Sequence, residues 1–189
     1  IPALLLEQPD KKYDKLLKRI AKYEQITDDI EVEIATYLTK VSEGEMSHDT
    51  SRKIRAMLKI IDDLESVGDV IYQISRIVDN NYQRKIEFTD EQKHSLKEII
   101  EIVKEAIVEM NLNLSTSYSD VNSKPAYSFE RKINKKRDVL RQNHIDDLKA
   151  KKYKHKVGAY YSDMFSLSEK VGDYVFNVTE AIKEYQTAE

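Results

Sequence analysis

The stretch LESVGDVIYQIS at residues 64–75 returns 104 residues later as SEKVGDYVFNVT at residues 168–179. Glutamate, valine, glycine and aspartate are identical between the two copies, and most of the remaining positions are conservative replacements. A repeat with one glycine at a fixed place indicates a chain built from two related halves. Each copy carries a glutamate and an aspartate four residues apart, so in a helix both carboxylates share one face.

The composition favours long helices joined by short loops. The 189 residues include only 4 glycines and 3 prolines, while 34% are charged and 40% are hydrophobic. There is no cysteine, which excludes disulfides and thiolate metal sites. Strand alternation is missing, and so are the Walker, Rossmann and Gly-x-Ser-x-Gly motifs. We therefore predict an all-α protein that is not an enzyme.

Apolar residues at helical spacing predict five helices. Thr89 with Gln92 resembles a capping box, and Pro125 suits a first helical turn. Helices of about 30 residues are about 45 Å long, and loops between them favour an elongated antiparallel bundle over the alternative of a long coiled coil. The predicted helices cover approximately residues 10–44, 49–80, 89–114, 125–150 and 157–185. The apolar stripe of the first helix comprises Leu16, Ile20, Tyr23, Ile30, Ile34, Leu38 and Val41.

Acidic pairs border the apolar stripes of this predicted bundle. Glu65 and Asp69 flank Gly68, a mid-helix glycine that costs about 1 kcal/mol relative to alanine and so suggests a closely approaching neighbour. Glu24 and Asp28 on the first helix have the same spacing. Converging carboxylates repel one another, and a hard cation would relieve that repulsion. Oxygen ligands suit Mg, Ca, Mn or iron better than zinc.

The second half repeats this arrangement with one change. Glu169 and Asp173 flank Gly172, while Glu130 and Asn134 correspond to the acidic pair of the first helix, with an amide in place of one acid. With 34 acids in the chain, roughly six such pairs are expected from composition alone, mostly on solvated faces. Spacing alone therefore leaves open both a metal site and a merely hydrated acidic face.

The Glu-x-x-Gly-Asp element resembles the signature of PhoU-type phosphate-uptake regulators. The segments KYEQITDDIEVEIATYL, IIDDLESVGDVIYQIS, FERKIN and YYSDMFSLSEKVGDYVFNV are most similar to the PhoU-like soluble domain of bacterial Na/phosphate cotransporter (type II-related) proteins. The resemblance implies two pseudo-repeated three-helix units, at residues 10–86 and 87–189, after a leader at residues 1–9. Because only five helices are visible, the first helix of repeat one is expected upstream of Ile1 or within the long first helix.

This resemblance also implies a function. The implied function is that of a non-enzymatic regulatory domain on the cytoplasmic face of the bacterial inner membrane. Its implied partner is a transporter membrane domain of the same polypeptide, and a homo-oligomer is a further possibility. Ser66 and Lys170 depart from the arginine usual in the family. The implied ligands for Fe, Zn, Mn or Mg are Glu24, Asp28, Glu65 and Asp69 in one site, and Glu130, Asn134, Glu169 and Asp173 in another.

Two other functional classes compete with this one. A purely structural interaction or oligomerisation domain, without metal, would use the acids only to hydrate a surface. A ferritin-like di-iron enzyme needs two Glu-x-x-His elements, whereas Glu91 and His94 form the sole example. The first alternative stays open, and the second is disfavoured.

Residues 131–156 form a basic stretch with 11 Lys/Arg and 3 acids, whereas the rest of the chain has 20 Lys/Arg and 31 acids. A solvated helix-turn-helix is the simplest interpretation, and docking to an anionic leaflet or an acidic partner is the second. Nucleic acid is not expected as a partner because the remainder is acidic. The candidate patch consists of Lys149, Lys151, Lys152, Lys154 and Lys156.

Overall fold

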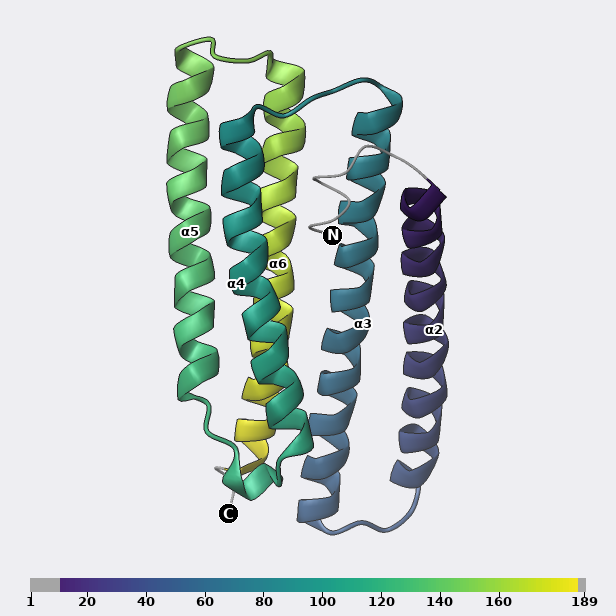
Figure 1. Ribbon diagram of the computed structural model, residues 1–189. Helices are drawn as coiled ribbons and strands as arrows, with labels where there is room; N and C mark the ends of the chain where they lie inside the picture. The colour runs from purple at the N-terminus through teal and green to yellow at the C-terminus, as the bar shows by residue number, and fades with distance from the viewer. Residues whose placement is uncertain (1–10, 187–189) are drawn as a thin grey trace.

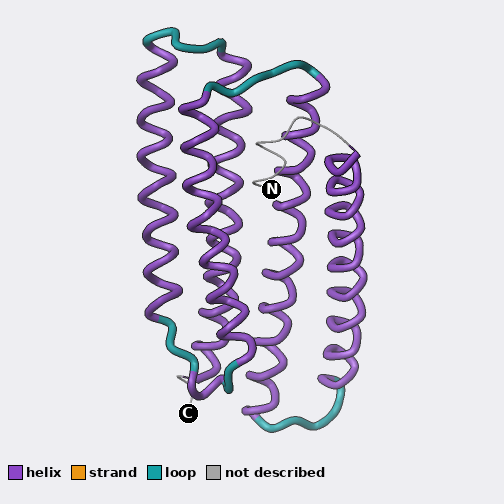
Figure 2. The backbone as a smooth tube through the Cα atoms, viewed as in Figure 1, coloured by secondary structure: helices purple, strands orange, loops and turns teal. Residues whose placement is uncertain are grey.

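The computed structural model describes residues 11–186, which form a bundle of long α-helices (Figure 1). The helices are α2 (Lys11–Ser42), α3 (His48–Gln83), α4 (Asp90–Ser115), α5 (Lys124–Lys149) and α6 (His155–Gln186), with a 3-10 turn, η1 (Tyr118–Asp120), before α5. No strand occurs within residues 11–186, and short loops join the helices (Figure 2). The predicted all-α antiparallel bundle is confirmed. The predicted leader at residues 1–9 lies outside the described part of the chain.

Local sequence signals explain where the helices begin. Thr89 and Gln92 form the predicted capping box at the start of α4: each side chain accepts a hydrogen bond from the other's backbone N–H, at 3.2 and 3.0 Å. Ser47 caps α3 by accepting from the Thr50 N–H at 3.1 Å. Pro125 lies in the first turn of α5, where a missing N–H is harmless. Predicted and observed helix ends differ by at most about three residues.

The helices form a three-helix unit and a two-helix unit that share a central contact. The chain segments α4, α5 and α6 pack on one another, α3 packs on α6, and α2 packs principally on α3. In Figure 1, α3 and α6 lie in the middle of the bundle, while α2 and α5 lie at its edges. In Figure 1, α2 runs downward and α3 upward, whereas α5 runs upward and α6 downward. The predicted boundary near residue 86 falls between these units and stays a prediction.

The core is built mainly from α3, α4 and α6, and α2 contributes little to it. Met164, Val178 and Ile182 of α6 are fully buried, whereas the only apolar residues described as buried on α2 are Tyr13 and Leu38, at 4% and 7% exposure. Tyr23 belongs to the predicted apolar stripe of the first helix, from which a position in the core or at its edge is expected, and this expectation is wrong because Tyr23 is 54% exposed. The physical reason is that α2 packs principally on one helix, α3, whereas its apolar stripe is wide enough to contact two helices. No described helix is both long and apolar enough to cross a membrane.

Candidate metal centre

Each of the two repeated glycines lies where a neighbouring helix comes very close. A Cβ added at Gly68 of α3 would lie 2.8 Å from Thr27 Oγ1 of α2, and one added at Gly172 of α6 would lie 2.7 Å from Ile133 Cδ1 of α5. The predicted close approach is confirmed at both glycines. Thr27 and Ile133 are 106 residues apart, as are Glu24 and Glu130, so the helix pairs α2–α3 and α5–α6 are packed in equivalent registers.

Beside Gly68, this packing brings acids of two helices together. Glu24 and Asp28 of α2 and Asp69 of α3 each offer one carboxylate oxygen, and the three oxygens lie within 4.8 Å of one another. All three residues are half-buried. Opposite oxygen ligands of an ion such as Mg²⁺ or Ca²⁺ are about 4–5 Å apart, since metal–oxygen bonds are about 2.1–2.5 Å long. The observed spacing therefore fits a hard cation without a large movement of either helix.

Two further acids adjoin this triad. Burial raises the pKa of Glu65, and the charges of Asp69, Asp28 and Glu31 raise it further, whereas the Ser66 hydroxyl lowers it. We name Glu24, Asp28, Glu31, Glu65 and Asp69 the first-half acidic cluster. Glu31 was not among the ligands predicted from the sequence. It follows Glu24 by seven residues, which is two helical turns, so this spacing could have placed it on the same face.

The negative charges of the first-half acidic cluster are not compensated by ion pairs within residues 11–186. Burial raises the pKa of Glu24, and the carboxylates of Asp28 and Asp69 add to this effect. None of the ion pairs formed by residues 11–186 includes a member of the cluster. Asp28 Oδ1 is buried and has no hydrogen-bond partner among the described residues. An arrangement of this kind favours a bound cation over five uncompensated charges.

The equivalent cluster of the second half is neutralised from within. The Arg137 Nη1 is 3.1 Å from Glu169 Oε1, and Arg137 stands where the first half has Glu31. The Asn134 amide donates a hydrogen bond to Glu130 Oε1. Burial raises the pKa of Asp173 to about 6; Glu169 and Glu130 add to the rise, and Arg137 opposes it. Within residues 11–186, only the first half brings three carboxylate oxygens into a common site.

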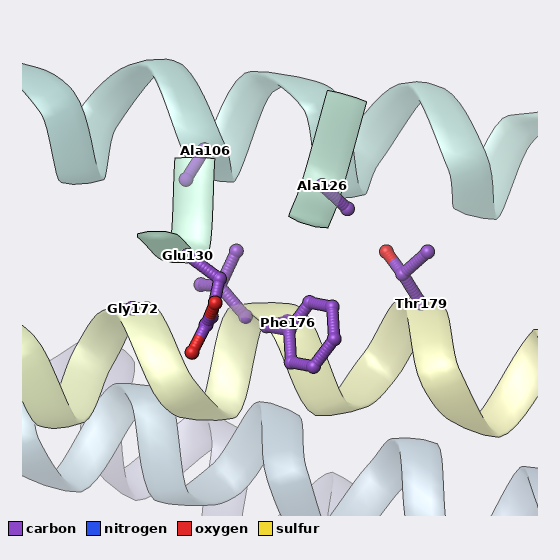
Figure 3. Close-up of a pocket in the computed structure, with 7 residues that line it drawn as sticks. Ala106, Ala126, Glu130, Gly172, Phe176 and Thr179 are labelled. Atoms are coloured by element: carbon purple, nitrogen blue, oxygen red, sulfur yellow. The ribbon is translucent and has the colours of Figure 1, made fainter. Parts of the chain in front are cut away.

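The small cavity beside Gly172 offers no room for a ligand. Figure 3 shows Glu130 reaching from α5 toward α6 at the level of Gly172. The cavity has a volume of about 10 Å³, which is at the lower limit for one water molecule. It is lined by Ala106, Ala126, Glu130, Gly172, Val175, Phe176 and Thr179. The predicted second site therefore lacks the geometry of the first.

The five lysines of the candidate basic patch are exposed around the turn between α5 and α6. Two of them are paired with nearby acids: Lys152 with Asp147 at 2.7 Å and Lys149 with Asp146 at 3.5 Å. Lys151 has a left-handed backbone, with φ of 56°, which reverses the chain after α5. In Figure 1 this turn and the beginning of α2 lie at the same end of the bundle.

Comparison with known proteins agrees with the geometry. The PhoU domain family matches residues 5–78, a segment that contains α2, most of α3 and the whole first-half acidic cluster. The second half is similar to this segment in sequence through the internal repeat of residues 64–75 and 168–179. This match supports the predicted PhoU-like character of the chain. The PhoU family is regulatory and not catalytic. Neither the curated proteins nor the solved structures compared with the chain include a match.

Proposed function

We propose that this chain is a non-enzymatic PhoU-like domain that regulates phosphate transport and binds a hard metal ion between α2 and α3. The observation that carries the metal is the meeting of Glu24, Asp28 and Asp69 oxygens within 4.8 Å, while none of the ion pairs within residues 11–186 includes these acids. Glu65 and Glu31 would complete the ligand set or hold its bound water. The PhoU match over residues 5–78 supports the regulatory role.

In this proposal the ion links two helices that repel each other without it. Because α2 packs principally on α3, a cation shared by Glu24, Asp28 and Asp69 would decide how firmly α2 is held. When bound, the metal supplies positive charge, and no reaction is assigned to it. The oxygen-only ligand set favours Mg²⁺, Mn²⁺ or iron, with zinc less well matched.

The partner and location are proposed from the distribution of charge. The basic turn and the beginning of α2 share one end of the bundle (Figure 1), and Lys151, Lys154 and Lys156 form no ion pair within residues 11–186. An end of this kind suits the anionic cytoplasmic leaflet of a bacterial inner membrane. We propose that a transporter membrane domain, carried by the same polypeptide, lies beyond it.

Metal binding can be tested on the chelator-stripped protein with a control inside the same chain. Mg²⁺, Mn²⁺, Fe²⁺ and Zn²⁺ are added singly, and thermal unfolding and elemental analysis are measured. At 100 times Kd a ligand stabilises by about 2.7 kcal/mol, which for this size corresponds to a rise in Tm of about 5–10 °C. Glu65→Gln with Asp69→Asn should abolish the rise. The matched pair Glu169→Gln with Asp173→Asn should preserve it.

The opposite outcome would favour a different function. If no metal raises Tm and elemental analysis finds none, the chain is better described as a structural interaction domain whose acids hydrate one face. If the second-half pair abolishes the rise and the first-half pair does not, the metal lies in the wrong half for this proposal.

A further inference from the structure

Two hollows share a wall at the end of the bundle where α3 begins and α6 ends, the lower end in Figure 1. One has a volume of about 310 Å³ and lies between the first turns of α3 and the last turn of α6. The other has a volume of about 440 Å³ and lies beside η1. Tyr185 lines both, and we call the two together the Tyr185 groove. Each volume is within the range of roughly 300–1,000 Å³ that is usual for small-molecule sites.

Cationic side chains of α3 line the Tyr185 groove. Residues 51–60 contain four Lys/Arg and no acid, and all four cations line the groove: Arg52, Lys53, Arg55 and Lys59. Three of them are spaced by three and four residues, so they share one face of α3 and follow one another over about 10 Å. Among the described lining residues, Glu184 alone is acidic. The groove is therefore cationic, although the whole chain has a net charge of -3.

The charges of these cations are only partly compensated. Lys59 Nζ lies 3.1 Å from Glu184 Oε1, and two other cations share Asp49, at 3.3 and 3.1 Å. Arg55 is exposed and forms no ion pair within residues 11–186. Four cations thus face two acids. Because ion pairs at the surface contribute little stability, an anionic ligand can replace them at small cost.

The opposite wall of the groove offers an aromatic ring and hydroxyl groups. Tyr185 contacts Tyr118 edge to face, with ring centroids 6.1 Å apart, and Gln186 Nε2 donates a hydrogen bond to the Tyr118 carbonyl oxygen. These contacts hold η1 against the end of α6. Ser117 and Ser119 line the same hollow, and their hydroxyls can donate to the oxygens of an anion. The wall therefore combines hydrogen-bond donors with a ring on which a flat group can stack.

The internal repeat shows that the scaffold does not require these cations. Three of the four have uncharged or acidic equivalents in α6: Val157, Ala159 and Asp163 stand at the positions of Lys53, Arg55 and Lys59. Both segments are nevertheless fully helical. The row of cations is thus a property of the first half alone, and forming the helix does not account for it.

A row of neighbouring cations selects a ligand that carries several negative charges. The arginine guanidinium binds phosphate through two parallel hydrogen bonds, and the lysine ammonium binds it as a point charge. A single carboxylate or orthophosphate would occupy only part of the row. A chain of phosphate groups has charged oxygens along its whole length, as the cations are arranged along α3.

We propose that the Tyr185 groove binds a small molecule that carries a chain of two or three phosphate groups, with Arg52, Arg55 and Lys59 holding the phosphates. Inorganic triphosphate and a nucleoside triphosphate share this chemistry, and in a nucleotide the base would stack on Tyr185. The groove lies at the opposite end of the bundle from the turn between α5 and α6 (Figure 1). It includes no member of the first-half acidic cluster, so the proposal does not depend on metal binding.

Calorimetric titration of the metal-free full chain with inorganic triphosphate tests the proposal. Arg55→Gln with Lys59→Gln should weaken binding by about tenfold or more, the loss expected when one hydrogen bond to a charged group is removed. The matched control is Arg131→Gln with Lys135→Gln, which removes the same charges at the same spacing from exposed positions of α5. The control should bind as the wild type does. Circular dichroism checks that both variants keep their helices, and Glu184→Gln should tighten binding because it removes the competing acid.

A comparison of ligands tests the chain of phosphates. Orthophosphate and the tricarboxylate citrate should bind much more weakly than triphosphate. A higher affinity for ATP that Tyr185→Leu removes would identify a nucleotide, and an affinity for triphosphate equal to or above that for ATP would identify the phosphate chain alone. Both outcomes support the proposal.

Four results would overturn it. They are equal affinities for citrate and triphosphate, no binding of triphosphate or ATP at millimolar concentration, binding only to vesicles of anionic lipid, and an equal loss in the α3 and α5 variants.

Discussion

At the scale of single residues, Gly68 and Gly172 determine how closely the helix pairs approach. A methyl group at Gly68 would meet the Thr27 hydroxyl at 2.8 Å, and Thr27 is β-branched and holds a 2.7 Å hydrogen bond to the Glu24 carbonyl. It cannot move aside as the end of a long side chain could. The glycine therefore has a packing role, and it also fixes the distance between the acids on either side.

We expect Gly68→Ala to destabilise the protein by about 1–3 kcal/mol, although alanine favours helices, because overpacking outweighs the propensity gain. Chemical denaturation would measure the change. Gly44→Ala is the control, because its nearest neighbouring atom, the Val41 carbonyl oxygen, is 3.9 Å from the added Cβ. If Gly68→Ala with Thr27→Ala is no more stable than Gly68→Ala alone, the contact with Thr27 is not the cause.

Asp173 gives the stability a characteristic pH dependence. Its pKa is about 6 in the folded state and about 3.9 in the unfolded state. Between about pH 4 and 6 the folded protein holds a proton that the unfolded chain has released, so the free energy of unfolding falls as pH rises through this window. Asp173→Asn should remove this slope and raise stability at pH 7 by about 1–3 kcal/mol. Urea denaturation of both proteins at pH 4, 5, 6 and 7 would measure the free energy of unfolding. If Asp173→Asn has the same slope against pH as the wild type, another group is responsible.

At the scale of helices, one position separates the two halves chemically. Glu31 on α2 and Arg137 on α5 are equivalent in register, yet one adds a negative charge to its cluster and the other pairs with Glu169. The first half thus has an acidic cluster that no described cationic side chain pairs with, whereas the equivalent cluster of the second half includes the cationic side chain of Arg137.

We expect Glu31→Arg to stabilise the metal-free protein and to abolish stabilisation by metal, because the new guanidinium would pair with Glu65 as Arg137 does with Glu169. Thermal unfolding with and without metal measures both effects. Glu33→Arg, two residues further along the helix on an exposed side, is the control for charge alone. A metal response that survives Glu31→Arg would show that position 31 does not decide occupancy.

The sequence predicts the helices well because their signals are local. The capping box at Thr89, Pro125 and the apolar spacing each depend on neighbours in the chain. The acidic triad is also foreseeable, since Glu24, Asp28 and Asp69 follow from spacing and the glycine. What could not be predicted is the exposure of Tyr23, or the pairing of Arg137 with Glu169, because each depends on which helix lies on which side. An apolar stripe does not reveal whether its partner is present.

A buried hydrogen bond also joins elements far apart in sequence. The Asn113 amide of α4 donates to Thr179 Oγ1 of α6 at 3.1 Å, and both residues are buried. Thr179→Val keeps the shape but leaves the amide without that acceptor, so we expect a loss of about 1–3 kcal/mol of stability. Pairing it with Asn113→Leu should recover part of the loss in a double-mutant denaturation cycle. No recovery would mean that the bond is not the origin of the effect.

At the scale of the whole molecule, stability is unevenly distributed. The inner helices α3 and α6 are packed on several neighbours, whereas α2 rests principally on one. Helices with few buried contacts open more readily than the core does. We expect amide hydrogen exchange to be fastest, among the helices, in α2, and a bound metal to slow exchange in α2 and α3 selectively. Uniform slowing across all helices would argue against an ion between these two.

The helix at the centre of the bundle follows its packing partners in the chain. Because α6 supplies the surface on which α3, α4 and α5 assemble, these three helices leave the ribosome before the helix that covers their apolar faces. Those faces stay exposed until α6 has been made, and a translation stop within α6 would yield a product that chaperones or proteases recognise as incomplete.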